Sequence, residues 1–240
     1  MPTTLHLAAA LLLLPGAAAA PAQIHSPQIN LQRHHAEDLS WLWQYTQPAP
    51  GSRENQLVND PNFKPFLQHN LTAPQSFWGD ARPLADVALE FLALPGEVLG
   101  ENARYVTATG CVPHFCPDRG LLWVDLGLPK PLVAFAAIDW ITDNRATDEK
   151  GAAYTLWLFS NPPLDPAHIP AALTRSIARW TAQPSPGATE LQNITRVLLV
   201  DPDGTPHTLA PATVGAHNTL PAETSNETFD SPAPATKAKP

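Results

Sequence analysis

The amino-acid sequence predicts an α+β fold, in which helices pack against a central antiparallel β-sheet. Strand-like runs follow one another closely in the middle of the chain, and stretches with helical apolar spacing lie before and after them. Proline accounts for 28 of the 240 residues, which argues against long helical bundles because proline interrupts helices. Hydrophobic residues make up 44% of the chain, enough for the core of one domain with appended segments.

Three stretches before the strands are predicted to be helical. Within residues 36–46, one apolar face is formed by residues at three- and four-residue spacing, namely Leu39, Leu42 and Trp43. A short helical or irregular piece is expected around Phe63, Phe66 and Leu67. The third stretch is an amphipathic helix over residues 84–94, whose apolar face is formed by Leu84, Val87 and Phe91.

The middle of the chain has the composition of consecutive β-strands. Four runs rich in β-branched and aromatic residues are predicted to be strands: residues 104–109, 121–126, 132–140 and 154–160. Turn-forming residues separate these runs. The connections are too short to hold crossover helices, which favours antiparallel pairing.

The chain after these strands predicts one more helix and a hairpin. Between residues 165 and 183, apolar residues recur every three or four residues, which predicts a helix. Asp165 is suited to cap this helix and Pro166 to begin it. A last strand over residues 194–200 runs into Asp-Pro-Asp-Gly. The chain is expected to return as a hairpin through residues 205–209.

The sequence divides into four segments. Residues 1–22 have the pattern of a secretory signal, because an apolar run is followed by small residues and by Ala-Pro-Ala before Gln23. Residues 23–83 are predicted to be a helical or irregular region, and residues 84–209 the α+β domain with its C-terminal helix and hairpin. Residues 210–240 contain few large apolar side chains, so they are predicted to be a disordered tail.

The signal predicts a periplasmic or secreted protein. The mature chain contains no apolar run long enough to cross a bilayer, so no membrane span is expected. The 14 basic and 22 acidic residues give a net charge of −8, which argues against a nucleic-acid partner and favours a basic one.

The two cysteines, Cys111 and Cys116, lie close together, and in an oxidising compartment such a pair predicts a disulfide. The small ring would point Pro113 and His114 outward on a stiff loop, which suits binding because preorganisation lowers the entropic cost of association. A stapled strand connection with a solvated histidine is the alternative. Two cysteines and one histidine lack a fourth ligand, so neither a metal site nor a cofactor is predicted.

The stretch YVTATGCVPHFCPDRGLLWVDL resembles the inhibitor of vertebrate lysozyme family, whose signature CKPHDC is flanked by strands. The signature is matched in order and spacing by Cys111, Pro113, His114 and Cys116. The resemblance covers about residues 85–160. It implies a non-catalytic, periplasmic and often homodimeric protein. Its disulfide-closed loop would enter the active-site cleft of a lysozyme-type glycosidase, where the histidine meets the catalytic carboxylates.

The loop departs from the family signature at two positions, because Val112 replaces lysine and Phe115 replaces aspartate. These changes make the loop more apolar and leave the identity of the target lysozyme or muramidase open. Asp118 and Arg119 are expected contacts at the rim of the loop. The predicted lysozyme-binding loop itself consists of Cys111, Val112, Pro113, His114, Phe115 and Cys116.

Two other functions remain open from the sequence. One is an exported envelope hydrolase or redox enzyme in which His114 acts as a base, although the chain contains neither Gly-x-Ser-x-Gly nor Cys-x-x-Cys. The other is a binding protein that shares the fold but has a different partner. Turnover of a substrate would identify the first, and direct binding to lytic enzymes would separate the second from an inhibitor.

Overall fold

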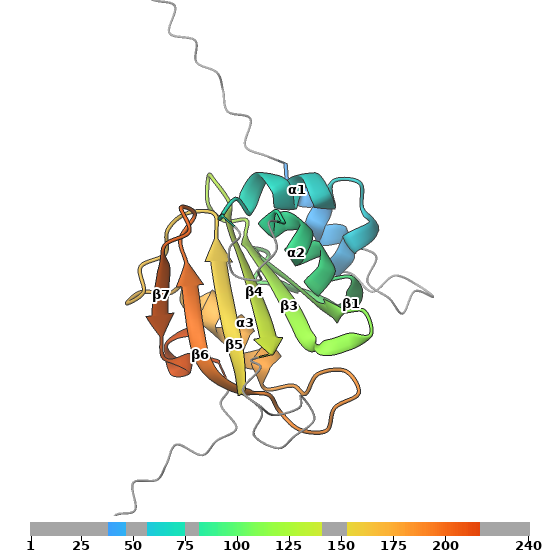
Figure 1. Ribbon diagram of the computed structural model, residues 1–240. Coiled ribbons are helices and arrows are strands. Elements are labelled where there is room, and N and C mark those ends of the chain that lie inside the picture. The colour runs from blue at the N-terminus through green and yellow to red at the C-terminus, as the bar shows by residue number, and fades with distance from the viewer. Residues whose placement is uncertain (1–37, 47–56, 75–81, 141–152, 217–240) are drawn as a thin grey trace, which may run out of the picture. The chain divides into compact units, whose positions relative to one another are not determined.

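The computed structural model describes residues 38–46, 57–74, 82–140 and 153–216 (Figure 1). The predicted export signal at residues 1–22 and the chain beyond residue 216 lie outside these residues. Among the described residues, no helix is both long enough and apolar enough to cross a membrane.

The described residues form a seven-stranded sheet whose strands lie side by side in chain order. The strands are β1 (Leu94–Glu101), β2 (Tyr105–Val112), β3 (Phe115–Asp125), β4 (Leu132–Trp140), β5 (Ala153–Ser160), β6 (Asn193–Val200) and β7 (Pro206–Leu209). Neighbouring strands are antiparallel except β5 and β6, which run parallel. The predicted α+β fold with helices on an antiparallel sheet is confirmed, with this one parallel pair as the exception.

The parallel pair arises because a helix connects its two strands. After β5 the chain forms α3 (Ala171–Thr181) on one face of the sheet, and it then returns to the starting end of β5 before β6 begins. Antiparallel neighbours need only a short turn, whereas parallel neighbours need a crossover of about this length. The sequence predicted the helix, but apolar periodicity does not report in which direction the next strand runs.

Helices cover both faces of the sheet (Figure 1). One face is covered by α1 (Phe63–Asn70), α2 (Leu84–Phe91) and the 3₁₀ helices η1 (Ser40–Thr46) and η2 (Leu57–Asn59). The other face is covered by α3 and by the 3₁₀ helix η3 (Pro211–Val214).

The buried side chains of the central strands divide between these two layers. In β4, Val133 and Phe135 pack in the layer of α1 and α2, whereas Ala134 and Ile138 pack in the layer of α3. All four are completely buried. Because successive side chains of a strand point to opposite faces, a strand covered on both sides must be apolar at consecutive positions.

Three helices differ from the sequence-based expectation. α2 ends at Phe91 instead of Leu94, which is the first residue of β1. Residues 40–46 form a 3₁₀ helix rather than an α-helix. α3 begins at Ala171 instead of near Asp165, whose carboxylate accepts a 2.9 Å hydrogen bond from the amide of Ala167 in a separate turn. Pro170 directly precedes α3, and a proline disfavours helical geometry in the residue before it, so the helix cannot extend upstream.

The strand β1 was not predicted, because its sequence contains residues that weaken strand propensity. Pro95 is tolerated at the edge of the sheet, and the register of β1 against β2 shifts between Pro95 and Val98. Gly100 allows η1 to pack closely on β1, since a Cβ atom at this position would lie 2.6 Å from the ring of Trp43.

The packed part of the chain continues past residue 209, where the predicted domain ends. Val214 of η3 is completely buried in the layer of α3. Gly215 has a φ of 76°, and a Cβ atom there would lie 2.6 Å from the carbonyl oxygen of Thr174. Glycine therefore permits both the backbone conformation and the close approach to α3. Residues 210–216 belong to the packed domain rather than to the predicted tail.

An ion pair joins the start of β2 to the end of β3. Arg104 donates hydrogen bonds from Nε and Nη2 to the two carboxylate oxygens of Asp125, each at 2.7 Å, and the amide of Gly127 donates a third at 2.9 Å. Burial alone would raise the pKa of Asp125, but these hydrogen bonds outweigh it and hold the pKa below its ordinary value of 3.8.

The variant Asp125→Asn is expected to lower the free energy of unfolding at pH 7 by about 1–3 kcal/mol, because charge-assisted hydrogen bonds are lost. A depressed folded-state pKa stabilises the protein above the unfolded-state pKa, and this contribution disappears as pH falls through the folded-state value. The difference between wild type and variant should therefore shrink between about pH 5 and pH 2. Urea titrations across this range measure it, and a difference independent of pH would contradict the assignment.

Candidate functional site

The predicted loop is the tip of the hairpin formed by β2 and β3. In this hairpin Cys111 lies opposite Arg119, and Val112 lies opposite Phe115. The register shifts between these two pairs, because Cys116, Pro117 and Asp118 of β3 have no partner in β2. The loop therefore consists of a two-residue turn, Pro113-His114, on a bulged base.

A disulfide between Cys111 and Cys116 closes the base of the turn, as the sequence predicted, with the two Cα atoms 4.9 Å apart. Cys111 is buried, with 1% of its surface exposed, whereas Cys116 is half-buried. The bond thus ties the outer bulge of β3 to a buried residue of β2, and the turn is fixed at both of its ends.

The turn holds His114 in an unusual backbone conformation. Its φ is 66°, in the left-handed region that non-glycine residues seldom adopt, at a cost of about 1 kcal/mol. A proline followed by a residue of positive φ is the pattern of a type II β-turn, which fits Pro113-His114. Both residues are exposed to solvent. Among the described residues, no side chain forms a hydrogen bond with the His114 ring.

Apolar residues lie next to Pro113-His114 in the chain and opposite the base of the turn on the neighbouring strand. Val112 and Phe115 are half-buried beside the turn. On the neighbouring strand, Leu94 lies opposite Cys111 and has 46% of its surface exposed. Leu94 is a candidate contact residue that sequence analysis missed, because it belongs to β1, the strand that was not predicted.

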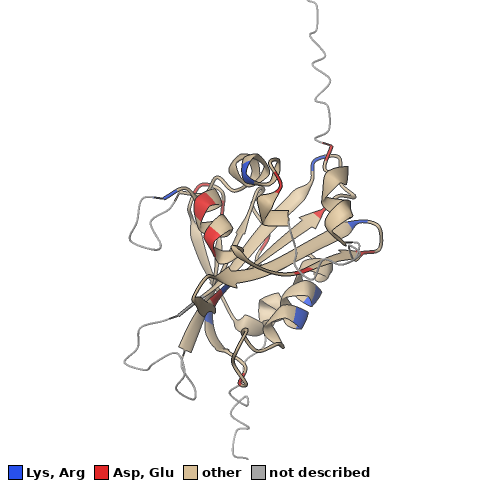
Figure 2. Ribbon diagram, turned by 90° about the vertical axis from the view of Figure 1, so that its right-hand side faces the viewer, with Lys and Arg blue, Asp and Glu red and all other residues tan. Residues whose placement is uncertain are grey.

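Charge is sparse across the sheet, and Figure 2 shows most of the ribbon without charged residues. Strand β2 carries no Lys, Arg, Asp or Glu at all. Near the loop, Glu97 of β1 is exposed and Asp118 is half-buried. Among the described residues 93–118, the single Lys or Arg is Arg104, which lies at the far end of β2 and pairs with Asp125.

Arg119 does not lie at the rim of the loop, contrary to the sequence-based expectation. Its side chain is 3% exposed, lies 5.1 Å from the ring centre of Trp180 and donates a 3.4 Å hydrogen bond to the carbonyl of Pro184. Burial lowers the pKa of Arg119 to about 10. Alternation along β3 explains the burial, because Arg119, Leu121 and Trp123 point to the same face, the face that α3 covers.

The expected rim contact at Asp118 is positioned differently from Arg119. Asp118 is half-buried in the bulge next to the disulfide, so part of its surface is accessible. It therefore stays a candidate for contact with a partner. Among the described residues, no group of three His, Cys, Asp or Glu side chains is placed to hold a metal ion.

Comparison of the chain with protein-family models, with curated proteins and with solved structures finds no match. The resemblance to lysozyme inhibitors therefore rests on the loop motif and its flanking strands, and inhibition stays a prediction.

Replacing Cys111 and Cys116 together by alanine is expected to lower the free energy of unfolding by only about 2 kcal/mol, because so small a ring removes little entropy from the unfolded chain. A urea titration followed by tryptophan fluorescence measures the loss. The wild-type protein treated with a reductant serves as the control for the substituted side chains. A loss larger than about 4 kcal/mol would show that the disulfide supports the core rather than the loop alone.

Proposed function

We propose that this protein is an exported, non-catalytic inhibitor of a lysozyme-type glycosidase, which it blocks by inserting the disulfide-closed turn into the active-site cleft. The observation that carries the proposal is the exposed imidazole of His114 at the tip of a two-residue turn closed by a disulfide. The export signal predicted from the sequence and the disulfide agree with a periplasmic or secreted location.

The shape of the turn suits a narrow acidic cleft. Glycosidases of this type carry two carboxyl groups about 5–9.5 Å apart on either side of the scissile bond. A single imidazole fits between such groups, donates a hydrogen bond to one of them and gains strength from charge when it is protonated. Pro113 and the disulfide restrict the turn before binding, so little conformational entropy is lost in the complex.

The surroundings of His114 indicate what the rest of the contact would be. Val112 and Phe115 flank the turn, and Leu94 lies opposite Cys111 on the neighbouring strand, so apolar side chains accompany the imidazole and suit the apolar walls of a substrate cleft. Glu97 and the net charge of −8 favour encounter with a basic enzyme.

A second candidate is a binding protein whose partner is not a lysozyme. It is favoured by Val112 and Phe115, because the loop lacks the lysine and the aspartate of the inhibitor signature. Catalysis by His114 is less well supported, since a catalytic base is normally oriented by a hydrogen-bonded partner and no described side chain bonds to this ring. Pull-down against c-type, g-type and bacterial lytic enzymes distinguishes the two binding functions.

The variant His114→Asn is expected to weaken inhibition at least 30-fold, as is typical of a residue at the centre of an interface. Asparagine tolerates positive φ better than most residues, so the turn should keep its conformation while it loses the imidazole. Turbidity clearing of bacterial cell walls measures inhibition of the enzyme panel. His69→Asn, which removes an exposed histidine from α1, is the matched control.

His69→Asn should inhibit as well as wild type, and the thermal midpoints of both variants should stay within about 2 °C of it. Full inhibition by His114→Asn would exclude the imidazole as the inhibitory group. Failure of the wild-type protein to inhibit any lytic enzyme would overturn the proposed function.

The variant Leu94→Asp is expected to weaken inhibition about tenfold, because it places a charge opposite Cys111 at the base of the turn and removes an exposed apolar side chain from the proposed contact. Leu128→Asp is the matched control: Leu128 is 40% exposed, compared with 46% for Leu94, and it lies between β3 and β4 at the end of the sheet away from the loop. It should change inhibition less than twofold. Equal effects of the two variants would exclude Leu94 from the contact surface.

A further inference from the structure

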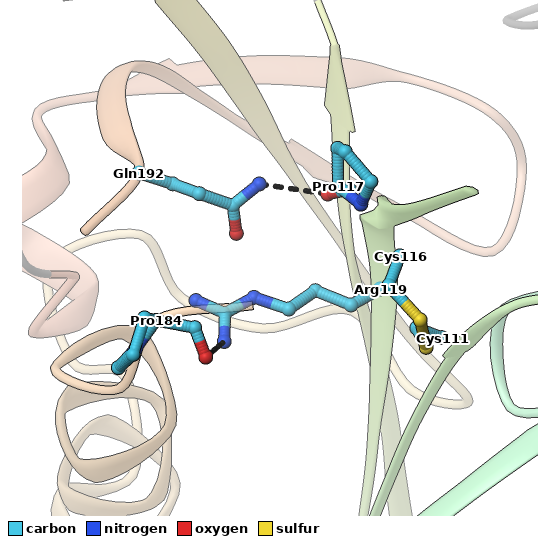
Figure 3. The surroundings of a disulfide bond; sticks show 6 residues. All are labelled: Cys111, Cys116, Pro117, Arg119, Pro184 and Gln192. Carbon is cyan, nitrogen blue, oxygen red and sulfur yellow. Dashed lines mark hydrogen bonds between the residues drawn. A yellow bond between two sulfur atoms is a disulfide. The ribbon is translucent and has the colours of Figure 1, made fainter. Parts of the chain in front are cut away.

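The segment between α3 and β6 contacts the base of the loop. Gln192 donates a hydrogen bond of 2.7 Å from Nε2 to the carbonyl of Pro117, the residue directly after Cys116 (Figure 3). From the same segment, the carbonyl of Pro184 accepts the hydrogen bond from Arg119. Two residues that follow the disulfide are thus held by a segment about 70 positions later in the chain.

The hydrogen bond from Gln192 is placed where the sheet provides none. Pro117 lies in the bulge of β3, which has no partner in β2, and its neighbour Cys116 is the outer end of the disulfide. Gln192 is 5% exposed and Pro117 is half-buried, so this hydrogen bond is partly shielded from water. Shielded hydrogen bonds are not replaced by solvent when they break, and they restrict the groups that they join.

Arg119 and Gln192 also have unused hydrogen-bonding capacity. Among the described residues, Nε and Nη2 of Arg119 and Oε1 of Gln192 are buried without a hydrogen-bond partner. Figure 3 shows the amide oxygen of Gln192 on the side of the guanidinium. A buried cation with unpaired donors is costly, so a carboxylate at position 192 would find favourable charge nearby.

We propose that Gln192 is a positioning residue that holds the disulfide loop ready for its partner, with Arg119 and Pro184 as a second contact of the same segment. The turn is then anchored on one side by Cys111 in β2 and on the other by Gln192 through Pro117. Without the contact from Gln192, a looser turn would lose more entropy on entering a cleft, which would weaken inhibition. This consequence for inhibition rests on the proposed function.

The test compares amide hydrogen exchange, measured by NMR, in wild type and in Gln192→Glu. The carboxylate that this variant introduces cannot donate a hydrogen bond to the carbonyl of Pro117, so the loop should loosen. The same carboxylate is attracted to the positive charge of Arg119, so the fold should stay stable. The expected result is at least fivefold faster exchange at His114, Phe115 and Cys116. Exchange in β4 and the thermal midpoint should remain unchanged.

Two further variants complete the test. Gln183→Glu makes the same change at an exposed position of the same segment, and it should leave exchange in the loop unaltered. Gln192→Met removes the hydrogen bond without burying a charge, and it should loosen the loop as Gln192→Glu does. Loop exchange that stays at the wild-type rate in both Gln192 variants would overturn the inference, and so would equal acceleration throughout the sheet.

The exchange experiment contains no enzyme, so its outcome is independent of whether the protein inhibits a lysozyme. With an enzyme that wild type inhibits, both Gln192 variants should raise the inhibition constant about fivefold while His114 is still present. An unchanged inhibition constant together with a loosened loop would overturn the claim that Gln192 prepares the loop for binding.

Discussion

Burial of the sheet on both faces is the constraint on which the rest of the structure depends. Strands β3, β4 and β5 are apolar at consecutive positions, so each face must be covered, by α1 and α2 on one side and by α3 on the other. To cover the second face, the chain after β5 crosses it as α3 and returns to the starting end of β5, so β6 runs parallel to β5. The same crossover brings Gln192 to the bulge at Pro117.

Strand β3 connects this core to the loop. Its later residues, such as Leu121 and Trp123, are buried under α3, whereas its first residues leave the regular ladder as a bulge. Arg119 marks the boundary, because it still follows the alternation of the strand and is buried against Trp180. The direction of the turn is therefore set by the packing of β3 between β2 and β4, and the disulfide then limits its local freedom.

The side chains of the loop define which contacts the proposed complex would depend on. Between the two cysteines, the side chains are Val112, Pro113, His114 and Phe115, so the imidazole is the one ionisable group. Recognition would combine a single polar contact with apolar contacts from the turn and from Leu94. Such an interface selects its partner mainly by the shape of the cleft, because few hydrogen-bonding groups must be matched.

The sequence by itself determined the α+β class, most strand and helix positions, and the disulfide around His114, because these follow from local patterns: apolar periodicity, turn residues and an isolated cysteine pair. Tertiary structure alone decided that β1 pairs at the edge, that Leu94 lies beside the loop, and that Arg119 is buried rather than exposed. The contact of Gln192 with Pro117 joins residues 75 positions apart. Local patterns carry no information about such pairings, which depend on how the helices cover the two faces of the sheet.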